Sequence, residues 1–270
     1  MPAPSVVASL HGRPAASGTS HSISFAAGSL TNGLIAIAID VSYGGTPSNV
    51  QWGGAAATLL LTQGNLWYYG KEGATGGTQN VTFDISIDSR PPYSFVSVTD
   101  AGAFGTASGT SSTASGNRST PSITCPSGGL VLGCYREEFT STNPSVVAGT
   151  IAGSPGFALD GNGKAISAAY RTDTGVLTWA SDNGAFAWDA IGVPINSATS
   201  LAQAAYRFGN DDGSESGNTW MVGQNTAATI PLGGAARVRF MLQATGDPAA
   251  TTYQLEFRKV GDATWKKVSP

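Results

Sequence analysis

The sequence predicts an all-β protein, in which a β-sandwich built from two similar halves is followed by a smaller β-module. Composition is the first reason, because 36 of the 270 residues are glycine and only 11% are charged, less than half the share of a typical soluble domain. The second is that short apolar or alternating segments recur between turn residues, as they do in sandwiches and barrels. The third is that no segment keeps an apolar period of 3.6 residues over three turns, so little helix is expected.

A repeated pattern indicates the two halves. Residues 122–135 combine a short strand, a Gly-rich turn and a strongly apolar strand, and a similar pattern begins at Ser22 and resumes at Gly33. Comparable aromatic and alternating segments follow each copy, at 66–71, 81–87 and 93–98 in the first and at 166–171, 175–179 and 186–193 in the second. We therefore expect a sandwich domain over 21–194, with similar halves at about 21–104 and 119–194.

The remaining segments of this region have simpler signals. Residues 1–20 are rich in Pro, Ala and Ser without a period, which predicts an extended N-terminal arm, either a floppy terminus or a segment that orders on a neighbour. Residues 34–41 are almost continuously apolar, as in a strand covered on both faces. Low-complexity residues 104–120 and Gly/Ser/Pro-rich residues 140–163 are expected to be long connections.

A separate β-module is predicted over 195–270. Its expected strands lie at 201–208, 237–244, 253–260 and 265–268. Tyr253, Leu255 and Phe257 alternate with polar residues, so they would share one face of a strand. The hairpin turn at 260–265 resembles those of immunoglobulin- and fibronectin type III-like modules. A unit this small is expected to need stabilising contacts with the first domain or with copies of itself.

Charge and cysteine content exclude several classes of partner. The net charge of −3 gives no attraction toward nucleic acid or an anionic membrane, and neither a membrane-spanning run nor a signal peptide is expected. Cys125 and Cys134 would lie out of register across a hairpin, which argues against a disulfide between them. With no further ligand nearby they are expected to be buried thiols and not a zinc site.

Catalytic chemistry is not expected. His11 and His21 are the only imidazoles, and both fall in or beside the predicted arm, where a base could not be held in place. Glu137 and Glu138 would point to opposite faces of a strand, and Asp84 and Asp88 suit a solvated edge. A β-sandwich hydrolase or lyase is the disfavoured alternative, and no catalytic residue or cofactor is predicted.

Two other clusters have an ordinary and a functional interpretation. Residues 210–215 (Asn-Asp-Asp-Gly-Ser-Glu) faintly resemble a calcium loop but lack its full ligand spacing, so a β-turn is preferred and no metal is predicted. Trp67, Tyr68 and Tyr69 are expected to pack in the core. Their alternative role is an exposed platform on which a glycan stacks.

Two stretches carry a resemblance to known proteins. Residues 204–215 and 253–258, with Trp220 and Arg237–Arg239 between them, resemble a C-terminal β-module of structural proteins of tailed bacteriophages. The Ser-Ile-Ser and Gly-Leu-Ile pattern at 22–35 resembles the jelly-roll-like sandwiches that accompany this module. The resemblance implies a jelly-roll-like fold and a virion component, namely a capsid decoration, head-fibre or tail-fibre protein. It carries over no catalytic residue.

The expected partners follow from the resemblance. They are the major capsid protein or other virion proteins, together with copies of the chain itself, arranged by analogy as a trimer. The expected location is the virion, assembled in the host cytoplasm. The alternative function is a receptor- or glycan-binding module of a tail fibre.

Overall fold

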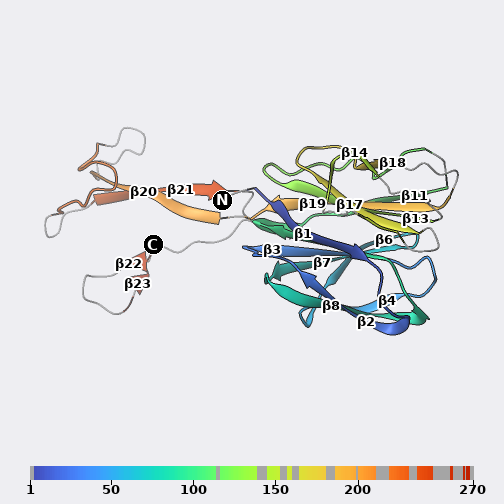
Figure 1. The fold of residues 1–270 in the computed structure, drawn as a ribbon. Coiled ribbons are helices and arrows are strands. Elements are labelled where there is room, and N and C mark those ends of the chain that lie inside the picture. Colours follow the sequence, from blue (N-terminus) through green and yellow to red (C-terminus); the bar gives the residue numbers. More distant parts are fainter. Residues whose placement is uncertain are drawn as a thin grey trace. The chain divides into compact units, whose positions relative to one another are not determined.

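The computed structural model divides the chain into two compact units, Met1–Ala198 and Thr199–Pro270 (Figure 1). The boundary lies four residues after the predicted one. The residues that the structure describes are 3–113, 116–138, 145–152, 157–159, 164–180, 186–198, 200–210, 219–230, 236–245, 256–257, 264 and 266–267. Within these ranges the chain contains strands and no helix, which confirms the all-β prediction.

The first half of unit 1 is a two-sheet sandwich. One sheet has the order β1-β9-β3-β7-β6 and the other the order β2-β8-β4-β5. The strands are β1 (Ser5–Gly12), β2 (Gly18–Ala26), β3 (Gly33–Asp40), β4 (Pro47–Trp52), β5 (Ala55–Ala56), β6 (Thr58–Gln63), β7 (Leu66–Ala74), β8 (Thr78–Ser89) and β9 (Tyr93–Thr99).

The second half repeats this arrangement. Its larger sheet has the path β10-β19-β13-β17-β15, with β11 also pairing β19 and β16 pairing β17, and its smaller sheet has the order β12-β18-β14. The strands are β10 (Ala101–Phe104), β11 (Ser108–Ser112), β12 (Arg118–Ser119), β13 (Leu130–Glu137), β14 (Ser145–Ala148), β15 (Thr150–Ile151), β16 (Phe157–Leu159), β17 (Ala165–Arg171), β18 (Thr178–Ala180) and β19 (Trp188–Ser197).

The two halves share one topology. In each larger sheet the first strand of the half (β1 or β10) pairs with the last (β9 or β19), which pairs in turn with β3 or β13. In each smaller sheet the strand just before β3 or β13 (β2 or β12) pairs with the next-to-last strand of the half (β8 or β18). Strands β3 and β13, which the repeated sequence pattern singles out, take the same position. An internal repeat is therefore present, but its halves run from β1 to β9 and from β10 to β19, not over the expected 21–104 and 119–194. The specific jelly-roll topology stays a prediction.

The halves differ from the prediction in how they build the core. Each is a complete two-sheet sandwich, and the two pack through their larger sheets, so that four layers follow one another from β14 and β18 to β2 and β8 in Figure 1. Strand β3 shows why this works. Leu34, Ala36 and Ala38 face the second half, whereas Ile35, Ile37 and Ile39 face the smaller sheet of their own half, since successive side chains point to opposite faces.

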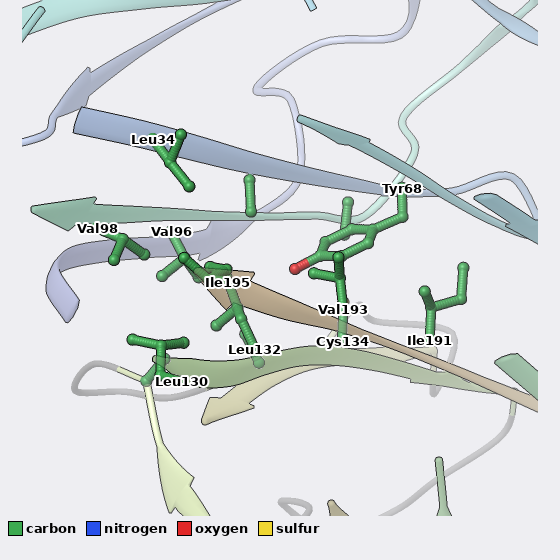
Figure 2. Packing of buried hydrophobic residues seen from close by; sticks show 14 of the residues in the cluster. Leu34, Tyr68, Val96, Val98, Leu130, Leu132, Cys134, Ile191, Val193 and Ile195 are labelled. Atoms are coloured by element: carbon green, nitrogen blue, oxygen red, sulfur yellow. The ribbon is translucent and has the colours of Figure 1, made fainter. Parts of the chain in front are cut away.

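The core between the halves joins both repeats into one body. Figure 2 shows Leu34, Tyr68, Val96 and Val98 of the first half against side chains of β13 and β19 in the second. Strand β13 contributes Leu130, Leu132 and Cys134 to this core, and its other face packs against the smaller sheet of the second half. The nearly continuous apolar runs of β3 and β13 are therefore explained by burial on both faces.

Three predicted loops are instead strands. Residues 5–12 form β1 and pair with β9, so the extended arm expected over 1–20 is wrong for this stretch; the pairing satisfies the backbone of a segment whose composition alone suggested disorder. The connection expected at 104–120 contains β11 and β12, and that at 140–163 contains β14, β15 and β16. The hairpin expected over 122–135 is also absent, because Ile123 forms a bridge with Gly175 and does not pair with β13.

Unit 2 contains a long two-stranded ribbon. Strand β20 (Ser200–Asn210) pairs antiparallel with β21 (Ala236–Thr245). Both strands lie where the sequence predicts strands, at 201–208 and 237–244. Short strands β22 (Glu256–Phe257) and β23 (Lys266–Lys267) form a second pair. The rest of the segments predicted at 253–260 and 265–268 lies outside the described residues.

Candidate functional site

The predicted aromatic cluster does not form one surface. Trp67, Tyr68 and Tyr69 follow one another on β7, so Tyr68 points into the core between the halves while Trp67 and Tyr69 stack on the opposite face, with ring centroids 6.4 Å apart. Tyr68 and Tyr69 are only 2% and 6% exposed. Burial raises the pKa of Tyr69 to about 12 because the charged phenolate is disfavoured there. The structure therefore places these residues in the core and not on a glycan platform.

His11 is held in a hydrogen-bonded position, contrary to the prediction of a mobile arm. Its Nε2 lies 2.8 Å from the carbonyl oxygen of Ala152, and its Nδ1 lies 2.8 Å from Ser94 Oγ. A carbonyl only accepts hydrogen bonds, so Nε2 carries the proton and Nδ1 accepts from the serine. Burial lowers the pKa of His11. Ser94 is buried, and this serine–histidine pair, through the carbonyl of Ala152, ties β1 to the second half.

His21 is also part of a strand. It lies on β2, buried against the ring of Phe83, with centroids 5.1 Å apart. Burial lowers the pKa of His21, and the carboxylates of Asp88 and Asp84 act in the opposite direction. His11 lies on β1 and His21 on β2, which belong to different sheets, and the structure does not bring the two imidazoles together.

The predicted carboxylates have separate surroundings. Asp84 accepts hydrogen bonds from Ser20 and Asn49 on the exposed face of β8. Glu137 is buried against Arg118, with Oε1 2.5 Å from Nη2, and it also accepts from the Tyr135 hydroxyl. Glu138 contacts Arg136 instead, so the two adjacent glutamates face opposite ways, as predicted.

The cysteines are free, with Cys134 buried and Cys125 partly so. Burial raises the pKa of the Cys134 thiol strongly. In the part of the chain that the structure describes, no group of three or more His, Cys, Asp or Glu side chains could hold a metal. The weak calcium-like pattern falls mainly at 211–215, outside the described residues.

A buried polar cluster that the sequence analysis missed lies where the two halves meet. We call Asp40, Ser42, Arg136, Glu138, Lys164 and Asp189 the interhalf cluster. Arg136 Nε is paired with Asp189, and Arg136 Nη1 lies 2.9 Å from Ser42 Oγ and 3.1 Å from Glu138 Oε1. Ser42 belongs to the first half and the other three to the second, so the guanidinium bridges the repeats.

Asp189 binds both halves from the opposite side of the cluster. It accepts from the backbone N–H of Asn65 at 3.0 Å and from the hydroxyl of Ser111. Asn65 follows Gly64, which has a positive φ of 53°. A side chain at Gly64 would collide with the Asp189 carboxylate, so glycine is required there both by backbone conformation and by this close approach.

The electrostatics of Asp40 differ from those of Asp189. Burial raises the pKa of Asp40 to about 6, while Arg136, Ser42 and Lys164 lower it in part. One carboxylate oxygen accepts from Ser42, and the other, Oδ2, has no hydrogen-bond partner. Lys164 stands near this group, with Nζ 4.0 Å from the ring centroid of Tyr43 and 4.0 Å from Glu138 Oε1.

One sequence signal could have found this cluster. In a chain with few charges, Asp40, Arg136 and Asp189 each interrupt or end a strongly apolar strand, and a charge in such a place must be paired when it is buried. The cluster is suited to fixing the two halves together, because its charged groups pair with one another next to the core between the halves.

The ribbon of unit 2 has two contrasting faces. Tyr206 pairs with Phe240 and Phe208 with Val238, so these four side chains share one face. Phe240 and Val238 are each 40% exposed. On the other face Arg207 and Arg239 lie over the ring of Trp220, at 4.4 and 5.4 Å from its centroid, which is a cation–π arrangement.

Comparisons with protein-family models, with curated proteins and with solved structures find no match. Within the described ranges, no helix is long and apolar enough to cross a membrane.

Proposed function

We propose that the chain is a non-enzymatic virion structural protein of a tailed bacteriophage, a capsid decoration or head-fibre protein attached to the coat lattice. The resemblance of residues 204–215 and 253–258 to phage structural modules suggests this class. The observation that supports it best is the apolar face of the β20–β21 ribbon, formed by Tyr206, Phe208, Val238 and Phe240. Exposed contiguous apolar side chains mark contact surfaces.

A second copy of this chain is the proposed occupant of that face. An isolated two-stranded ribbon is at best marginally stable in water, and burying its aromatic side chains against copies of themselves would stabilise it. Closed symmetric contacts of this kind are the rule in homo-oligomers, and we propose a trimer. Unit 1 supports the same role, because its interhalf cluster and shared core make a rigid body that suits a lattice component.

Analytical ultracentrifugation of the full chain tests the oligomer. Phe240→Asp should shift the chain to monomer, because a carboxylate would have to be buried in the contact. Leu59→Asp changes a 45% exposed residue of unit 1 and should leave the assembly unchanged. A wild-type monomer at all concentrations would overturn the proposed self-association.

Immunogold electron microscopy of purified virus particles, with antibody to unit 2, tests the virion role. Label over the head supports the decoration or head-fibre assignment. Label at the tail tip favours the alternative, a tail-fibre receptor-binding module. Absence of label from both would overturn the virion role, whatever the oligomeric state.

The alternative of glycan binding has its own observation. A shallow groove of about 480 Å³ on the smaller sheet of the first half is lined by Gln51, Gln79, Asn80, Thr78 and Thr82, together with two glycines. Neutral amides and hydroxyls both donate and accept hydrogen bonds, as sugar hydroxyls require. Binding of host polysaccharide that is lost in Asn80→Ala and kept in Trp67→Ala would place glycan recognition here.

A further inference from the structure

Three segments of the first half that lie outside or at the ends of its strands line a small cavity that contains two arginines and two serines. The cavity has a volume of about 310 Å³ and is lined by Arg13 and Ser17 from the β1–β2 connection, Tyr43 from the β3–β4 turn, and Asp88, Ser89 and Arg90 at the end of β8. The cavity is distinct from the interhalf cluster. The two are neighbours, because Lys164 of the cluster lies over the ring of Tyr43, which lines the cavity. Two of the lining residues carry a permanent positive charge.

Arg90 is positioned to present a free fork of donors. Its Nε donates to the carbonyl oxygen of Pro14 at 2.6 Å, which fixes the guanidinium against the β1–β2 connection. Within the described ranges neither terminal nitrogen of Arg90 has a hydrogen-bond or ion-pair partner. An arginine held in this way offers two parallel N–H groups, the geometry that binds a carboxylate or phosphate through two oxygens.

Ser89 provides an independent sign of a missing acceptor. The residue is 8% exposed, and its hydroxyl is buried without a hydrogen-bond partner. A buried hydroxyl without a partner costs free energy. A ligand oxygen seated against Ser89 would supply the acceptor, and the Ser17 hydroxyl lines the same cavity.

Charge selects the class of ligand. Arg13 and Arg90 contribute two positive charges and Asp88 one negative charge, so the cavity is net positive in a chain whose net charge is −3. We propose that this cavity is a binding site for a single oxyanion group, a carboxylate or a phosphate, held by the Arg90 fork with Arg13 and Ser89 as further donors. Asp88 at the site disfavours ligands with several negative charges by like-charge repulsion. The proposal is independent of the virion role.

Titration of the full-length ¹⁵N-labelled chain with inorganic phosphate, and separately with acetate, tests the site by NMR. Saturable shifts confined to residues 13–17, 43 and 87–90 are expected, and the ligand with the tighter binding distinguishes a phosphate from a carboxylate source. Arg90→Gln and Arg13→Gln should each weaken binding by about tenfold or more, the effect of losing a charge-assisted hydrogen bond. Asp88→Asn should strengthen it, because it removes the repulsion.

Lys71→Gln is the matched control, since it removes one positive charge from β7, outside this cavity. The Lys71→Gln variant should bind phosphate and acetate with the same affinity as the wild type. Equal weakening in Arg90→Gln and Lys71→Gln, or shifts scattered over the surface, would overturn the site, as would a lack of saturation with both anions. If thermal melting shows that Arg90→Gln is unfolded, Arg13→Gln and Asp88→Asn decide the question through their opposite expected effects.

Discussion

Arg136 on β13 and Asp189 on β19 stand opposite each other in the sheet register and form an ion pair whose side chains are 3% and 2% exposed. The pair also contacts the first half, through Ser42 and the backbone of Asn65. It therefore couples the pairing of two neighbouring strands to the joining of two repeats. A buried pair of this kind is costly to break, because the remaining partner keeps an uncompensated charge.

Asp189→Asn should lower the free energy of unfolding of unit 1 by about 3–5 kcal/mol, the cost of leaving Arg136 without its buried partner. Urea unfolding followed by tryptophan fluorescence measures it. Asp173→Asn breaks the pair with Arg171, in which Asp173 is 72% exposed, and should change stability little. If the two substitutions lower the free energy of unfolding equally, Asp189 does not stabilise the contact between the two halves.

Asp40 should make stability fall as pH rises. Its pKa is about 6 in the folded chain against an ordinary 3.8, so the folded state keeps a proton that the unfolded state releases between these values. The contribution is fully present below about pH 4 and is lost as pH rises through 6, by about 3 kcal/mol in total. Asp40→Asn should remove this loss. Unfolding curves at several pH values test it, and a wild-type minus variant difference that stays constant from pH 4 to 7 would contradict it.

Leu132→Ala should destabilise unit 1 by about 2–5 kcal/mol, because Leu132 is fully buried in the core between the halves and the change leaves a cavity there. Denaturant unfolding with probes in both halves measures it. The two halves should still unfold together, since they share this core. Leu59→Ala, at a residue that is 45% exposed, is the matched control and should lower the free energy of unfolding much less. If the two halves of the wild type unfold in separate transitions, the shared core does not couple them.

The two thiols should differ in reactivity. Burial raises the pKa of both thiols, but Cys134 is fully buried whereas Cys125 is partly exposed. Since the thiolate is the reactive form, a disulfide reagent should modify Cys125 in the native chain and reach Cys134 only after unfolding. Counting released chromophore before and after denaturation tests this, with Cys125→Ser as the control that leaves no fast phase. Rapid modification of Cys134 in that variant would contradict the burial of β13.

Local pattern was sufficient for part of this fold. The apolar runs of β3 and β13 and the similar order of segments in the two repeats predicted an all-β chain with two halves. The local sequence pattern did not predict the structure where pairing with a distant strand decides it. Residues 5–12 look like a disordered arm, yet they form β1 because β9 offers hydrogen-bond partners at its edge.

The aromatic residues of β7 show the same limit. Their types predict large buried area, and the structure places Tyr68 and Tyr69 in two different cores. The proposed glycan platform failed because neighbouring residues on a strand face opposite ways. The interhalf cluster was missed because its members are far apart in sequence, so that the charges within apolar strands do not show which of them meet.

The sequence alone therefore determined the strand-rich class, the internal repeat and the positions of strands β20 and β21, because these depend on alternation, turn residues and neighbouring segments. Only the tertiary structure decided that each repeat is a complete sandwich, that their larger sheets pack face to face, and that Asp40, Arg136 and Asp189 meet at the joint. Those features depend on contacts between distant segments, where shape, burial and the pairing of buried charges select one arrangement among many that the same local patterns would permit.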